Sequence, residues 1–149
     1  MSPSCSEPKR WVFERRLRTA WRRYQALGRR GERAAERYLR KRGFKIVARG
    51  ERGRLGELDL IAVDGRTVVF VEVKTRRSHD AGHPSEAVGS EKQKRLTRSA
   101  LANLKRHDLL ACASRFDVLA ITWPDDARKP KIEHIKNAFE ATGRGQMFS

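Results

Sequence analysis

Apolar residues recur along the chain with two spacings, and each spacing predicts one kind of element. A spacing of three or four positions predicts helices from Arg10 to Leu27, from about Gly31 to Arg42, and from about Ser90 to His107. Gly43 is well placed to end the second helix. Shorter apolar runs predict strands over residues 44–49, 56–63, 67–74, 116–123 and 131–135. This order of elements predicts a mixed α/β fold, with helices packed on a small sheet.

The second and third predicted strands carry acidic residues that a buried hairpin does not normally contain. Residues 64–65 read Asp-Gly, which is the strongest hairpin signal in the chain. Because side chains alternate between faces along a strand, a two-residue turn there places Glu57 opposite Glu72 and makes Asp59 a diagonal neighbour of Glu72. Lys74 shares this face. The sequence therefore predicts three carboxylates and a lysine on one patch of a largely apolar hairpin.

Like charges this close repel, and burying them costs free energy unless something neutralises them. A divalent cation such as Mg²⁺ or Mn²⁺ would do so, because oxygen-rich sites suit both metals. A metal of this kind, beside a lysine, favours phosphodiester hydrolysis. The alternative is that this end of the hairpin is exposed to solvent and that the carboxylates are ordinary surface charges.

The net charge of the chain indicates which kind of partner it binds. The 149 residues include 34 Lys and Arg against 18 Asp and Glu, which gives a net charge of +16. A positive charge of this size attracts nucleic acid or an anionic membrane surface, although the alternative is that the basic surface only aids solubility. The basic residues nearest the acidic patch are the predicted contacts to a phosphate backbone: Arg29, Arg30, Arg76, Arg77, Lys92, Lys94 and Arg95.

Several other classes of protein are disfavoured. No apolar run approaches the roughly 18 residues of a membrane-spanning helix. The N-terminus lacks the apolar segment of a secretory signal, so we expect a cytoplasmic protein, although its arginine-rich helix also resembles a transit peptide weakly. Cys5 and Cys112 match no zinc-ligand spacing.

The acidic patch resembles a known signature. Asp59 followed by Glu72-Val73-Lys74 is similar to the acidic residue plus Glu-x-Lys motif of the PD-(D/E)xK nuclease superfamily. The wider pattern resembles the YraN family, a UPF0102-type bacterial family of predicted endonucleases similar to archaeal Holliday-junction resolvases. The motifs that carry this resemblance are GRRGERAAERYL (28–39), GELDLIA (56–62), VFVEVKTR (69–76), KQKRL (92–96), RFDVLAI (115–121) and HIKNAF (134–139).

The resemblance implies a fold and a site. The fold is a restriction-endonuclease-like central mixed β-sheet flanked by helices, here over residues 28–149, preceded by a basic helical extension over residues 1–27. The implied metal ligands are Glu32, Asp59, Glu72 and the carbonyl of Val73, with Lys74 as the catalytic lysine and Gln93 as a supporting polar residue.

Three functions stay open at this stage. The first is a metal-dependent endonuclease acting on DNA, with branched or structured DNA as a possible substrate, no small-molecule cofactor, and a homodimer expected if both strands are cut. The second is a non-catalytic module that binds nucleic acid on the same fold. The third is an adaptor that docks on a membrane or partner through the helix over residues 10–27.

Overall fold

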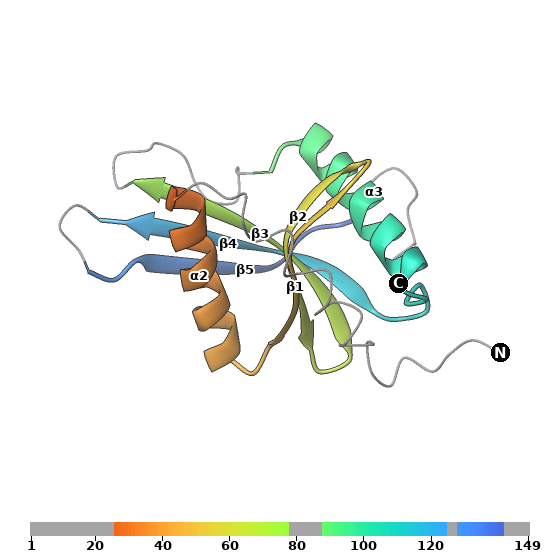
Figure 1. The fold of residues 1–149 in the computed structure, drawn as a ribbon, viewed down its shortest axis with the longest axis horizontal. Coiled ribbons are helices and arrows are strands. Elements are labelled where there is room, and N and C mark those ends of the chain that lie inside the picture. Colours follow the sequence, from red (N-terminus) through yellow and green to blue (C-terminus); the bar gives the residue numbers. More distant parts are fainter. Residues whose placement is uncertain (1–25, 78–87, 125–127, 142–149) are drawn as a thin grey trace.

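The fold is a five-stranded mixed sheet with one helix on each face, seen in a computed structural model that describes residues 26–77, 88–124 and 128–141 (Figure 1). Neighbouring strands follow the order β1-β2-β3-β4-β5, and every pair is antiparallel except the parallel pair β3–β4. This architecture confirms the predicted α/β class. The elements are α2 (Ala26–Lys41), β1 (Lys45–Gly53), β2 (Gly56–Asp64), β3 (Thr67–Arg77), α3 (Ser90–Arg106), β4 (Ser114–Trp123) and β5 (Lys131–Phe139).

Each face of the sheet forms its own apolar core. Alternate residues of β3 divide between the two: Val69 and Val71 pack with the buried side of α2, whereas Val68 and Phe70 pack with that of α3. This alternation is the period of two expected for a strand that is buried on both faces. The central strand β3 is therefore covered from both sides.

Helix α2 begins at Ala26, earlier than the predicted start near Gly31, and ends where the sequence indicates. Gly43 has a φ of +88°, a conformation that glycine adopts without strain. Its N–H donates to the carbonyl of Arg40 at 3.1 Å, and the N–H of Phe44 donates to the carbonyl of Leu39 at 3.1 Å. This pair of bonds is the Schellman motif, which turns the chain from α2 into β1. The predicted helix over residues 10–27 lies outside the described residues except for Ala26 and Leu27.

The predicted register of the β2–β3 hairpin is wrong. Asp64 pairs with Thr67, so the turn residues are Gly65 and Arg66 instead of Asp64 and Gly65. Gly65 has a φ of +62°, and a positive φ at the first turn residue is what a type II′ hairpin requires. The error moves every partner by two positions, which leaves each side chain on its predicted face.

Strands β2 and β3 separate at one end of the hairpin. Their regular pairing stops at Leu60 with Val71, whereas β3 stays paired with β4 as far as Arg77. Figure 1 shows the β1–β2 hairpin bending toward α3 while β3 continues beside β4. A Cβ atom at Gly56 would lie 3.3 Å from Oγ of Ser99, so the hairpin approaches α3 closely there. The separation leaves a gap in the sheet next to Asp59 and Glu72.

Candidate metal and nucleic-acid site

Asp59 and Glu72 are the first residues beyond the last regular pair of β2 and β3. Oδ2 of Asp59 accepts a hydrogen bond of 2.9 Å from the backbone N–H of Val73. The Asp59 side chain thereby satisfies the N–H of Val73 on β3, beyond the point where regular pairing with the β2 backbone ends. Glu72 is buried, with 6% of its surface exposed. Both carboxylates line a cavity of about 310 Å³ between the hairpin and α3.

Two lysines face these carboxylates. Nζ of Lys92, near the start of α3, donates a hydrogen bond to Oε1 of Glu72. Nζ of Lys74 lies 3.7 Å from the same oxygen. Lys92 was predicted to contact the nucleic-acid backbone, but the structure places its ammonium inside the carboxylate cluster.

Glu32 approaches from the other helix. It follows Gly31, where α2 contacts β3 so closely that a Cβ atom would overlap Thr75. Burial, together with the charges of Glu36 and Glu72, raises the pKa of Glu32 to about 7. Glu32 therefore belongs to the same electrostatic cluster as Asp59 and Glu72, and it comes from the α2 side of the sheet.

The cluster carries excess negative charge. Burial raises the pKa of Asp59 to about 8, with Glu72 beside it and Glu32 acting in the same direction. Burial also raises the pKa of Glu57, again helped by Glu72. These shifts mean that ionised carboxylates repel one another here and lack enough nearby positive charge.

The two lysines are shifted in opposite directions. Burial, followed by the neighbouring charge of Lys92, lowers the pKa of Lys74. Burial would also lower the pKa of Lys92, but its hydrogen bonds and the charges of Glu72 and Asp59 outweigh burial and raise it. Lys92 is thus the lysine that neutralises Glu72, and Lys74 is the lysine that gives up its proton more readily.

The other predicted site residues differ in how they relate to the carboxylate cluster. Glu57 lines the same cavity and pairs with Arg52 at 3.5 Å. Gln93 does not reach the carboxylates, because its amide Nε2 donates to the carbonyl of Val88 at 2.9 Å. Val73 lies between Glu72 and Lys74 on β3, opposite Leu119 of β4.

The predicted phosphate contacts are spread over three elements. Arg95 lines the carboxylate cavity, and the exposed Lys94 lies 3.6 Å from Glu91. On α2, Arg29 precedes Arg30, whose guanidinium lies 3.8 Å from the ring centre of Trp123. The backbone of Arg76 and Arg77 ends β3, opposite Thr122 and Trp123 of β4. Of these groups, Arg95 lines the cavity, whereas Lys94 and Arg30 contact other side chains.

The donor set fits a hard divalent cation in chemistry, because it consists of carboxylate oxygens with a backbone carbonyl beside them. Within the described ranges, however, no three His, Cys, Asp or Glu side chains stand close enough together to surround a metal ion. The ammonium of Lys92 already bonds to Glu72. A cation binding here would therefore replace Lys92 as the partner of Glu72.

Sequence reasoning missed a second buried ionic group, on β4 and β5. Asp117 is fully buried and accepts hydrogen bonds from Arg115 at 2.9 Å, from His134 at 2.8 Å, and from the backbone N–H of Asn137 at 3.0 Å. These bonds overcome burial and lower the pKa of Asp117. An aspartate in the middle of the apolar run FDVLAI was the available signal. Asp117 also lines a small space of about 10 Å³ together with Asp59 and Glu72, so this ionic group lies directly behind the carboxylates.

The fold and the site together define a small α/β protein with a buried carboxylate–lysine cluster, consistent with the predicted nuclease-like fold. Residues 31–121 match the uncharacterised protein family UPF0102. The chain belongs to this family, as its motifs indicate. No helix in the described part of the chain is both long and apolar enough to cross a membrane.

Relatives match most of the chain. A UPF0102 protein of Rhodopirellula baltica is 49% identical over 120 residues, which cover 78% of this chain and 72% of that protein. One from Geobacter sulfurreducens is 50% identical over 116 residues, covering 76% and 88%. One from Geobacter metallireducens is 47% identical over 116 residues, covering 78% and 93%. Their names give no activity, so the function has to be argued from the site.

Proposed function

We propose that this chain is a divalent-cation-dependent nuclease that hydrolyses phosphodiester bonds of DNA. The observation that carries the proposal is the meeting of Asp59 and Glu72 in the gap between β2 and β3, with Glu32 and two lysines around them. Burial first and the charge of Glu72 second raise the pKa of Asp59, and a cation beside this carboxylate would oppose both effects. The net charge of +16 supports a polyanionic substrate.

The residues have separate roles in this proposal. Asp59, Glu72 and the Val73 carbonyl would hold Mg²⁺ or Mn²⁺, with Glu32 next to them. Such a cation would supply an activated water and would stabilise the charge that develops on the phosphate. The oxygen of that water would bond to phosphorus as the water gives up a proton to solvent, one phosphorus–oxygen ester bond would break, and the leaving oxygen would take up a proton.

Lys74 is suited to that proton transfer. Its ammonium lies beside Glu72, and its lowered pKa makes it a better proton donor than an exposed lysine. Lys92 has another role. It holds the carboxylate of Glu72 until a cation takes its place, and the released ammonium then becomes available to a phosphate oxygen.

Cleavage assays test the proposal. Labelled duplex, single-stranded and branched DNA are incubated with Mg²⁺, Mn²⁺ or EDTA, and the wild type is compared with Glu72→Gln and Lys74→Met. We expect metal-dependent cleavage that each variant reduces by at least two orders of magnitude. Glu91→Gln and Lys105→Met are matched controls on exposed positions of α3 and should cleave as the wild type does.

The bond between Lys92 and Glu72 favours a second candidate, a nucleic-acid-binding module without catalysis. In that case the ion pair is a permanent part of the fold, and no cation replaces it. The same assay separates the two functions. A wild type that binds DNA but cleaves none of the three substrates, with Glu72→Gln binding equally well, would support the binding module and contradict the nuclease.

A further inference from the structure

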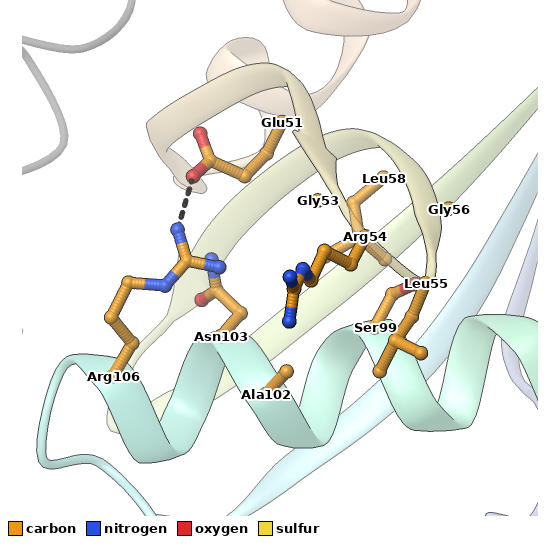
Figure 2. A pocket seen from close by; sticks show the side chains of 10 residues that line it. All are labelled: Glu51, Gly53, Arg54, Leu55, Gly56, Leu58, Ser99, Ala102, Asn103 and Arg106. Carbon is orange, nitrogen blue, oxygen red and sulfur yellow. Dashed lines mark hydrogen bonds and ion pairs between the residues drawn. The ribbon is translucent and has the colours of Figure 1, made fainter.

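A second cavity adjoins the carboxylate cavity, and the proposed reaction does not use it. It encloses about 290 Å³ between the tip of the β1–β2 hairpin and α3 (Figure 2). Gly56 and Ser99 line both cavities, so the two spaces meet at this wall. The volume lies at the lower end of the range for small-molecule sites, which begins near 300 Å³.

One buried amide in this cavity lacks partners. Asn103 is 1% exposed, and within the described residues neither its Nδ2 nor its Oδ1 has a hydrogen-bond partner. Figure 2 shows its side chain reaching from α3 toward the hairpin, beside Arg106. Buried polar groups are almost always paired, because leaving them unpaired is costly. The amide therefore offers a donor and an acceptor, side by side, to a molecule that enters the cavity.

The rest of the lining combines apolar surface with positive charge. Leu58 is buried in the wall, and Leu55 at the hairpin tip is 45% exposed. Arg106 lies 3.4 Å from Glu51 at the rim. The side chain of Arg54 extends into the space from the hairpin (Figure 2), and no ion pair or hydrogen bond holds it to another described residue. Arg54 can therefore change its rotamer at little cost when a group enters the cavity.

We infer that this cavity binds one unpaired nucleobase of the nucleic-acid substrate. A base presents apolar faces to Leu55 and Leu58, and its edge carries the adjacent donor and acceptor that an asparagine amide pairs with, as adenine does through N6 and N7. The phosphate attached to that nucleotide would lie near Arg54 and Arg106, which are suited to bidentate contacts with phosphate oxygens.

The inference rests on the proposed function, and it narrows the substrate. The wall shared through Gly56 and Ser99 places the bound base directly beside the carboxylate cavity. A base can enter only if it has no pairing partner. The substrate would therefore be DNA that carries an unpaired nucleotide next to the bond to be cut, as at a flap, a bulge or a branch point.

Binding in EDTA, which prevents cleavage, tests the inference. Two fluorescent DNA duplexes are compared, one with a single unpaired adenine and one with an abasic residue in its place. The wild type should bind the abasic DNA about tenfold more weakly, as loss of a bidentate base contact predicts. Asn103→Leu should bind both DNAs equally, whereas the control Lys105→Gln, at an exposed position of α3, should keep the wild-type preference.

One further measurement, read together with the cleavage assay, separates this inference from the proposed nuclease. Adenosine monophosphate is titrated while the side-chain amide signals of Asn103 are followed by NMR. A shift of these signals in a protein that cleaves no DNA would support the cavity's role and contradict the nuclease. A protein that cleaves DNA but binds both duplexes equally would overturn the base pocket and leave the nuclease standing.

Thermal unfolding without nucleotide excludes a merely structural role for Asn103. Because the amide has no partner in the described structure, Asn103→Leu should raise the melting temperature while it removes the preference for the unpaired base. A lower melting temperature would mean that water or protein groups satisfy the amide, and it would overturn the inference.

Discussion

Replacing Gly31 with alanine tests how closely α2 approaches the sheet beside the carboxylate cluster. The new Cβ atom would overlap Oγ1 of Thr75 and would lie 3.1 Å and 3.3 Å from Cβ and Cγ2 of the same residue. Forcing an extra methyl group into a packed contact costs about 1–3 kcal/mol. Alanine in a helix gains about 1 kcal/mol over glycine. Gly31→Ala should therefore lower the free energy of unfolding by up to about 2 kcal/mol.

A double-mutant cycle isolates the contact. In a Thr75→Ala background the overlap with Oγ1 is gone, so Gly31→Ala should be neutral or stabilising by up to about 1 kcal/mol. The coupling free energy between the two positions should then be about 1–3 kcal/mol. Urea denaturation of the four proteins measures it. Arg37→Ala, on the exposed side of α2, is the control and should show no coupling to Thr75→Ala.

One result would refute this reasoning. If Gly31→Ala raised the free energy of unfolding equally with and without Thr75→Ala, the two residues would not be in contact. Helix α2 would then lie farther from β3, and Glu32 would no longer be held near Asp59 and Glu72.

Three further predictions concern burial and charge. Asp59→Asn should raise the free energy of unfolding in EDTA at pH 7 by at least about 1 kcal/mol, because the Asp59 pKa of about 8 means that the fold disfavours the ionised carboxylate. A lower free energy of unfolding in chemical denaturation would contradict this. Asp117→Asn should destabilise the protein at pH 6, because the lowered pKa of Asp117 means that the fold favours its ionised carboxylate. This stabilisation is present above the ordinary pKa of an aspartate and is lost as the pH falls through the pKa of Asp117 in the folded protein. The difference in free energy of unfolding between variant and wild type should therefore shrink below about pH 4. A difference that does not change between pH 6 and pH 3 in urea titrations would argue against that bond network. Leu39→Ala should lower the free energy of unfolding by about 2–5 kcal/mol in the same assay, because Leu39 of α2 is fully buried against the sheet. A loss below about 1 kcal/mol would mean that this core is loosely packed.

The fold could be predicted from the sequence because its local signals agree with its packing. Gly43 ends α2 as predicted, and the period-two pattern of β3 gives both of its buried faces. The hairpin turn was misplaced because Asp64-Gly65 and Gly65-Arg66 both put a glycine where φ is positive, and the sequence alone does not rank them.

The meeting of the carboxylates could be predicted because a shift of two positions preserves the face of each residue. Asp59 and Glu72 therefore come together in either register. What the sequence could not give was the separation of β2 from β3, since nothing in the strand pattern marks where pairing stops.

The position of Lys92 could have been found from helical spacing. Lys92 lies four positions, or one helical turn, before the buried Leu96 on the same side of α3, yet its charge led to its prediction as a phosphate contact. Asn103 lies seven positions after Leu96 on the same buried side of α3. An amide among apolar residues at this spacing is a weak sequence signal of a buried polar group.

The single parallel pair of the sheet has a consequence for the order in which the molecule folds. Strands β1, β2 and β3 form a meander of short connections, whereas β3 reaches β4 only after the chain has passed through α3. Contacts between distant parts of a chain carry the larger entropic cost and tend to form later. Asp59 and Glu72 are thus brought together early, in a meander that has no ammonium group from α3. Lys92 arrives when α3 docks and pairs with Glu72. The step that closes the sheet therefore also reduces the repulsion between the two buried acids, and this couples the last folding event to the completion of the site.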